Sequence, residues 1–189
     1  MEYIGIKKKQ GSIVELLKDE ILSGHIASGT ELTQKELAES LGVSRMPVRE
    51  ALILLEYQGL IDRLPNNHVK VAEFTEDYFT HIFQICRNIE TDVLLSAEKI
   101  DELPEDELIF HSRIQEQIPF SFLSKTLSTI IEIYITFAVN SRFYDKENGK
   151  AVLKEISACL TKHDTDRLED LFNRYFAGMT CAIMKEREQ

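Results

Sequence analysis

The residues best suited to bind phosphate lie at the start of one short predicted helix. If Val48, Leu52 and Leu55 face the protein core, the first turn of this helix presents four side chains to solvent: Ser44, Arg45, Met46 and Arg49. Backbone N–H groups and hydroxyls at a helix N-terminus bind phosphate, and arginine binds phosphate or the O6/N7 edge of guanine. The pattern indicates contact with nucleic acid. The plainer alternative is that two surface arginines only solvate an exposed helix.

A second pair of residues, Glu107 and His111, has side chains that could bind a metal ion. Four residues apart, a carboxylate and an imidazole lie on one helix face and can share a divalent ion. Two protein ligands rarely hold zinc or nickel tightly, so the alternative is a polar pair within one helix. Cys86, Cys159 and Cys181 have no Cys-x-x-Cys spacing and indicate neither a zinc site nor a disulfide. We therefore expect no metal ion and no cofactor.

Common catalytic motifs do not occur in the sequence. It contains no Gly-x-Ser-x-Gly, no Gly-x-x-x-x-Gly-Lys and no His-Glu-x-x-His. Ser96 and Lys99 have the Ser-x-x-Lys spacing of penicillin-recognising enzymes. The companion motifs of those enzymes are missing, so we attribute this spacing to chance. We expect that the protein is not an enzyme.

The elements that position the two arginines are predicted to form a helix-turn-helix. Thr33 and Glu36 form a capping box that starts one helix, and Gly42 ends it. Ser44 is expected to cap the next helix. Two β-like runs follow, separated by a turn-forming tetrad at 65–68.

After Ala72 only helical periodicity is present, which predicts an all-helical bundle. The segment 122–138 is apolar nearly all round, as expected for a core helix or a dimer interface. Its most apolar part, 129–139, is too short to span a bilayer. We therefore expect no membrane partner.

Composition and charge limit the class of protein. The chain has 189 residues, with 22 Lys+Arg against 32 Asp+Glu and a formal charge of −10. This length allows one domain or two small ones. The acidity argues against nonspecific nucleic-acid binding, so any such contact depends on a local basic surface. Three widely spaced cysteines suit a reducing cytoplasm.

Several motifs between Ser12 and Thr75 match one known family. They are Gly24-His-Ile-Ala-Ser-Gly29, Glu31-Leu32-Thr33, Glu36-Leu37-Ala38, the run Leu41–Leu52 and the run Leu55–Ile61. In these motifs the sequence resembles the GntR family of bacterial transcription regulators. The resemblance implies a winged helix-turn-helix at residues 1–73, with a wing tip at 65–68. It implies DNA contacts at Lys35, Ser44, Arg45 and Arg49.

The wing departs from the family pattern. Asn67 and His68 stand where the family usually has glycine. Asparagine tolerates a left-handed backbone, so the turn is expected to form. His68 either enters the minor groove or is a surface turn residue. The lysines at 7–9 either add phosphate contacts or are simply solvated.

Residues 74–189 are similar to the ligand-sensing helical domain of the family's FadR-type branch, in a shortened form. Glu107-Leu-Ile-Phe-His111 resembles the metal motif of that branch, but Leu153 and Tyr175 stand where two further histidines are expected. Tyr175 is then a core aromatic residue. A pocket without metal could be lined by Arg87, Glu107, His111 and Tyr175, where an arginine suits a carboxylate effector.

The resemblance implies a homodimeric, cytoplasmic transcription regulator that binds a palindromic operator in double-stranded DNA. Effector binding to the helical domain is expected to change the DNA affinity. The competing interpretation is a protein-interaction adaptor whose winged domain has lost DNA binding. The overall acidity favours the adaptor, whereas the two outward arginines favour the regulator.

Overall fold

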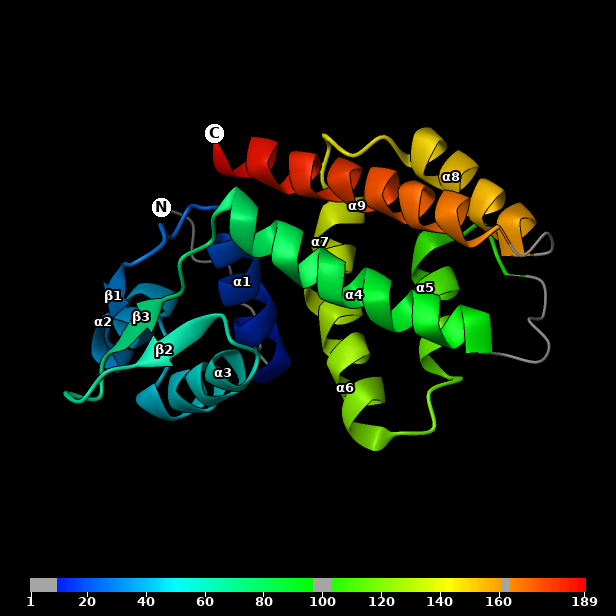
Figure 1. Cartoon of the computed structure of the whole chain (residues 1–189). Coiled ribbons are helices and arrows are strands. Elements are labelled where there is room, and N and C mark those ends of the chain that lie inside the picture. Colours follow the sequence, from blue (N-terminus) through cyan, green and yellow to red (C-terminus); the bar gives the residue numbers. More distant parts are fainter. Residues whose placement is uncertain (1–9, 97–102, 161–163) are drawn as a thin grey trace. The chain divides into compact units, whose positions relative to one another are not determined.

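The computed structural model describes residues 10–96, 103–160 and 164–189. The chain divides into two compact units between Phe74 and Thr75 (Figure 1). The lysines at 7–9 and Lys99 lie outside the described residues.

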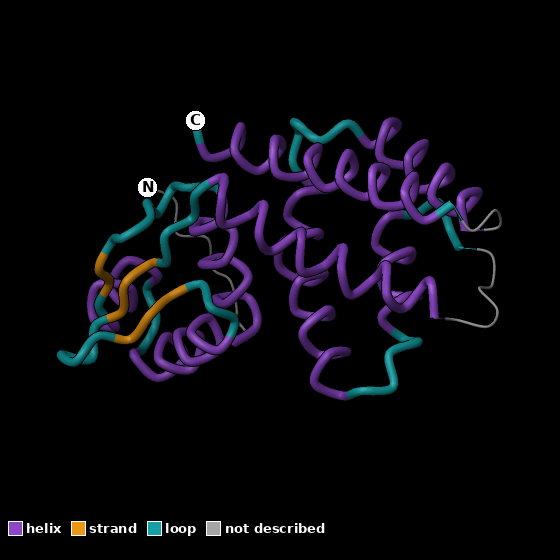
Figure 2. Tube along the Cα trace, in the orientation of Figure 1, coloured by secondary structure: helices purple, strands orange, loops and turns teal. Residues whose placement is uncertain are grey.

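The first unit combines helices with a small antiparallel sheet, and the strands of the described chain all lie in this unit (Figure 2). Its elements are α1 (Gln10–Leu22), β1 (Glu31–Leu32), α2 (Gln34–Leu41), α3 (Arg45–Tyr57), β2 (Ile61–Arg63) and β3 (Val69–Val71). The strand order is β1-β3-β2. Strand β1 was not predicted, because two residues have no periodicity and form a strand only by pairing with β3.

Apolar side chains of α1 and α3 form the core of the first unit. They include Ile13, Leu17 and Ile21 from α1 and Val48, Leu52 and Leu55 from α3, all of which are buried. Their spacing of three and four residues places them on one face of each helix. Because this face of α3 is buried, the opposite face of its first turn lies in solvent.

Local signals shape the helix-turn-helix largely as predicted. The hydroxyl of Thr33 accepts a hydrogen bond from the backbone N–H of Glu36 at 3.1 Å and donates to its carboxylate at 2.8 Å. Gly42 ends α2 with a φ of 63°, which favours glycine. Ser44 occupies the N-cap position of α3, but its hydroxyl makes no capping hydrogen bond. The expected cap by this side chain is therefore wrong.

The second unit is helical throughout its described residues. Its elements are α4 (Glu76–Ser96), α5 (Glu107–Gln115), α6 (Ser121–Ile130), the π-helix η1 (Ile131–Ile135), α7 (Thr136–Asn140), α8 (Lys146–Leu160) and α9 (Thr165–Arg187). Together the two units confirm the predicted fold class, mainly α with an N-terminal helix-turn-helix and a helical second part.

Helix α5 starts after Asp106, whose carboxylate accepts a hydrogen bond from the N–H of Ile109 at 3.0 Å. Helix α8 starts at Lys146.

One continuous helix, formed by α6, η1 and α7, contains a longer apolar segment than the stretch 129–139 considered in the sequence. Its 20 residues, Ser121–Asn140, are long and apolar enough to cross a bilayer by length and composition. Its burial is uneven, since Phe122 is 80% exposed whereas Leu127 is fully buried. The part from Leu127 onward belongs to the core of the second unit, and a buried core helix meets the same criterion.

Candidate functional site

The first turn of α3 carries the set of side chains that the sequence predicts to bind DNA. All four are exposed: Ser44, Arg45, Met46 and Arg49. Neither arginine has an ion-pair or hydrogen-bond partner among the residues that the structure describes. Val48 in the same turn is fully buried and fixes the direction of the others. Two guanidinium groups and a free hydroxyl at a helix N-terminus can bind a phosphate backbone or a base edge.

Lys35 lies on the exposed side of α2. Its ammonium is 3.9 Å from the carboxylate of Glu39, and both side chains are more than half exposed. Such a pair contributes little to stability. The ammonium of Lys35 can therefore leave the Glu39 carboxylate and bind a phosphate.

The turn between β2 and β3 is closed by backbone hydrogen bonds. The N–H of Leu64 donates to the carbonyl of His68 at 2.9 Å, and the N–H of Asn67 donates to the carbonyl of Leu64 at 3.0 Å. Asn67 has a φ of 61°, the left-handed conformation that the sequence predicts. His68 is partly exposed, and its Nδ1 lies 3.1 Å from Asn66. Contact of His68 with a minor groove stays a prediction.

In the second unit, His111 contacts polar side chains from two other helices. Its Nδ1 lies 2.6 Å from a carboxylate oxygen of Glu90 on α4, and its Nε2 lies 3.1 Å from the hydroxyl of Tyr175 on α9. Both His111 and Glu90 are fully buried. The imidazole of His111 therefore pairs with a carboxylate of another helix, that of Glu90 on α4.

Glu107 lies instead beside Tyr144, near the start of α8. Burial raises the pKa of the Glu107 carboxyl above its ordinary value. Burial, followed by the negative charge of Glu107, also raises the pKa of the Tyr144 hydroxyl. The phenol therefore stays protonated and can donate toward the carboxylate.

Gly149 of α8 lets Glu107 and Tyr144 approach the helix backbone. A Cβ added at this position would lie 2.5 Å from Oε1 of Glu107 and would also collide with the Tyr144 hydroxyl. We expect Gly149→Ala to lower the free energy of unfolding by about 1–3 kcal/mol, although alanine has the higher helix propensity. Urea unfolding measures this change. The matched control is Gly178→Ala on α9, where an added Cβ meets nothing within 4 Å. Equal stability of the two variants would contradict this packing argument.

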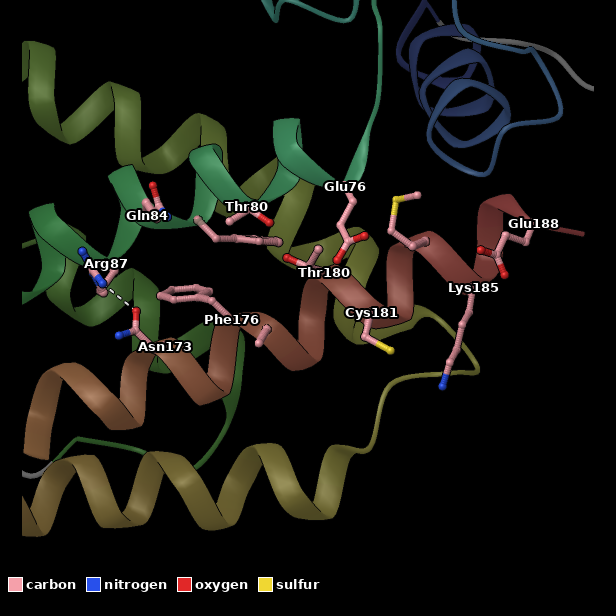
Figure 3. A pocket seen from close by; sticks show the side chains of 13 residues that line it. Glu76, Thr80, Gln84, Arg87, Asn173, Phe176, Thr180, Cys181, Lys185 and Glu188 are labelled. Atoms are coloured by element: carbon pink, nitrogen blue, oxygen red, sulfur yellow. Dashed lines mark hydrogen bonds between the residues drawn. The ribbon is translucent and has the colours of Figure 1, made fainter.

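Arg87 lies at one end of a surface groove between α4 and α9 (Figure 3). The groove has a volume of about 380 Å³, and its lining includes Thr80, Phe83, Gln84, Phe176, Ala177 and Lys185. The Arg87 guanidinium donates to the side-chain oxygen of Asn173 at 2.5 Å and lies 3.2 Å from the carboxylate of Glu169. The groove thus combines aromatic and aliphatic surface with a cation that two partners hold in place.

The structure divides the expected effector residues between two places. Arg87 lines the groove, whereas Glu107, His111 and Tyr175 are buried among α5, α8 and α9. The ring of Phe176 lines the groove and also stacks 5.9 Å from the ring of His111. Of the four residues expected to line an effector pocket, this groove therefore contains Arg87.

Glu90 is a member of the buried cluster that the sequence did not single out. It lies on the buried face of α4, together with Phe79, Phe83, Cys86 and Leu94. An acidic residue in such an apolar stripe needs a polar partner. The position of Glu90 in the apolar stripe could therefore have identified it as a residue with a buried polar partner. The sequence does not indicate which residue that partner is.

The first unit has the arrangement of a winged helix-turn-helix. Helices α2 and α3 meet at the Gly42 turn, and the β2–β3 hairpin forms the wing. Fold and site define the class of winged helix-turn-helix proteins, in which the second helix of the motif enters the major groove of DNA.

Comparison with known proteins gives the family. Residues 9–71 match the bacterial regulatory proteins of the gntR family. The HTH-type transcriptional repressor RspR of Escherichia coli is 45% identical, and the match covers 94% of this chain and 90% of RspR. The chain belongs to the GntR family.

Other similarities extend over different shares of the chain. YdhC of Bacillus subtilis, an uncharacterized HTH-type transcriptional regulator, is 35% identical over 101 residues, which are 53% of this chain and 44% of YdhC. The chain therefore spans about half the length of this relative. The solved structure of Escherichia coli McbR/YncC shares the fold, with a TM-score of 0.57 and 17% identity over 95% of this chain and 99% of that one. RspR is thus a transcriptional repressor and YdhC a transcriptional regulator.

Proposed function

We propose that this chain is a sequence-specific DNA-binding transcription regulator of the bacterial cytoplasm. The observation that carries the proposal is the pair of exposed arginines, Arg45 and Arg49, without partners among the described residues. They lie on the first turn of α3, where the helix N-terminus itself attracts phosphate. In a chain of charge −10, this turn is the local basic surface that DNA binding requires.

Each exposed side chain has a role in this proposal. Arg45 and Arg49 read base edges or anchor the helix on the backbone, and Met46 makes an apolar base contact. Lys35 and the uncapped hydroxyl of Ser44 bind phosphates. The wing, with His68, contacts the minor groove or the backbone.

The regulator binds a palindromic operator as a homodimer, with half-sites about one helical turn apart. Residues 1–73 bind DNA, and residues 74–189 carry dimerisation and effector binding. The part of the apolar helix from Leu127 onward is core, so it does not serve as the interface. Phe120, Phe122 and Leu123 are exposed and offer apolar surface to a partner subunit.

Selection from a random duplex-DNA library at moderate salt tests this proposal. The expected result is a short palindrome that binds two chains, as measured by analytical ultracentrifugation of the complex. A selected site without two-fold symmetry, or one chain per site, would contradict the dimer. Enrichment of no sequence would favour a protein-interaction adaptor.

The groove between α4 and α9 binds the effector, a small organic carboxylate that pairs with Arg87. Effector binding shifts the population of conformers that bind the operator. We expect Ala177→Trp, which fills the groove, to weaken effector binding at least about tenfold while leaving operator affinity without effector unchanged. Ala151→Trp on the exposed side of α8 is the control. Carboxylates that bind the chain and never alter operator affinity would contradict the effector proposal.

A further inference from the structure

Three side chains with metal-binding chemistry meet inside the second unit, apart from the DNA-contacting surface and the groove. They are Cys86 and Glu90, one turn apart on α4, and His111 on α5. One ligand atom from each lies within 4.8 Å of the others, and all three residues are fully buried. Helices α4 and α5, which carry them, are labelled in Figure 1.

The hydrogen bonds of this cluster are incomplete. One carboxylate oxygen of Glu90 is 2.6 Å from His111, but Oε2 is buried without a hydrogen-bond partner in the described parts of the chain. A buried carboxylate oxygen without a partner is costly. A cation among these atoms would offset the cost of the unpaired oxygen.

We propose that Cys86, Glu90 and His111 bind a divalent transition-metal ion of the Zn²⁺ type. Thiolate, carboxylate and imidazole are all ligands of tetrahedral zinc. Ligand bonds of about 2.0–2.3 Å require donor atoms about 3–4 Å apart, which small side-chain rotations reach from the observed separations. The bound ion ties α4 to α5 and has one coordination position left for water.

This site differs from the Glu107–His111 pair that the sequence suggested. The Glu107 carboxylate lies against Gly149 and Tyr144 and is not among the three clustered ligands. The two possibilities share only His111. Variants of Cys86 and of Glu107 therefore distinguish them.

Titration of the full chain with Co²⁺, after removal of metal by a chelator, tests the proposal. Co²⁺ substitutes for Zn²⁺ and gives an absorption band of thiolate-to-cobalt charge transfer when a cysteine is a ligand. We expect one Co²⁺ per chain with this band, displacement by Zn²⁺, and a higher Tm with either metal. Cys86→Ser should remove the band and weaken metal binding at least about tenfold.

Two control variants test whether the charge-transfer band depends on Cys86 in particular. Cys159→Ser alters another buried cysteine and should leave the band intact, as should Glu107→Gln. Circular dichroism of each variant in chelator shows whether it is folded, and Cys86→Ala serves if Cys86→Ser is not. No charge-transfer band in the native chain would overturn the proposal. So would a band that survives in the Cys86 variant or disappears with Glu107→Gln.

Discussion

Arg45→Ala together with Arg49→Ala is expected to reduce affinity for the selected operator by about 30-fold or more. Each lost arginine contact with a base or phosphate costs about 1–3 kcal/mol, and every 1.4 kcal/mol is about a factor of ten in affinity. If both arginines contact phosphate, the slope of log affinity against log salt also falls by about two. Fluorescence anisotropy with a labelled operator at several salt concentrations measures both quantities.

The double variant should keep its fold, because both side chains are exposed and have no partner in the described chain. The matched control is Arg113→Ala with Arg142→Ala, which removes the same charge from exposed positions of the second unit. A regulator loses operator affinity only with the first pair. Equal losses in both double variants would show that net charge, rather than α3, determines binding.

The DNA-contacting unit was largely predictable because its signals are local in the sequence. Thr33 caps a helix within three residues of itself, and Gly42 and Asn67 adopt positive φ where the turns need it. The exposure of Met46 follows from the burial of Val48, because two residues along a helix correspond to a rotation of about 200°. The hydroxyl of Ser44 was predicted less well, because a residue's N-cap position does not determine where its side chain points.

The polar cluster of the second unit could not be predicted, because its contacts join residues far apart in the sequence. Helical spacing pairs His111 with Glu107, whereas the folded chain pairs it with Glu90, 21 residues away. Tyr175 was expected as a core aromatic residue, and it is buried with its hydroxyl on the imidazole of His111. Periodicity identifies the buried face of a helix but not the neighbouring helix that it contacts.

The second large effect is expected from breaking the buried Glu90–His111 pair. His111→Leu leaves the Glu90 carboxylate buried without its imidazole partner, and we expect a loss of about 3–5 kcal/mol in the free energy of unfolding. At about 2–4 °C per kcal/mol for a chain of this size, the Tm should fall by roughly 10 °C. Urea and thermal unfolding in the presence of chelator measure the loss without any contribution from the proposed metal ion.

A double variant separates the cost of the unpaired charge from the cost of altered packing. Glu90→Leu combined with His111→Leu removes both polar groups, so it should recover much of the stability that His111→Leu alone loses. The exposed pair Arg113 and Glu116 provides the comparison, because its double alanine variant should change stability by less than about 1 kcal/mol. If the Leu/Leu variant is no more stable than His111→Leu, the loss comes from packing around the imidazole. The buried carboxylate would then not be the reason that α4 and α5 depend on this pair.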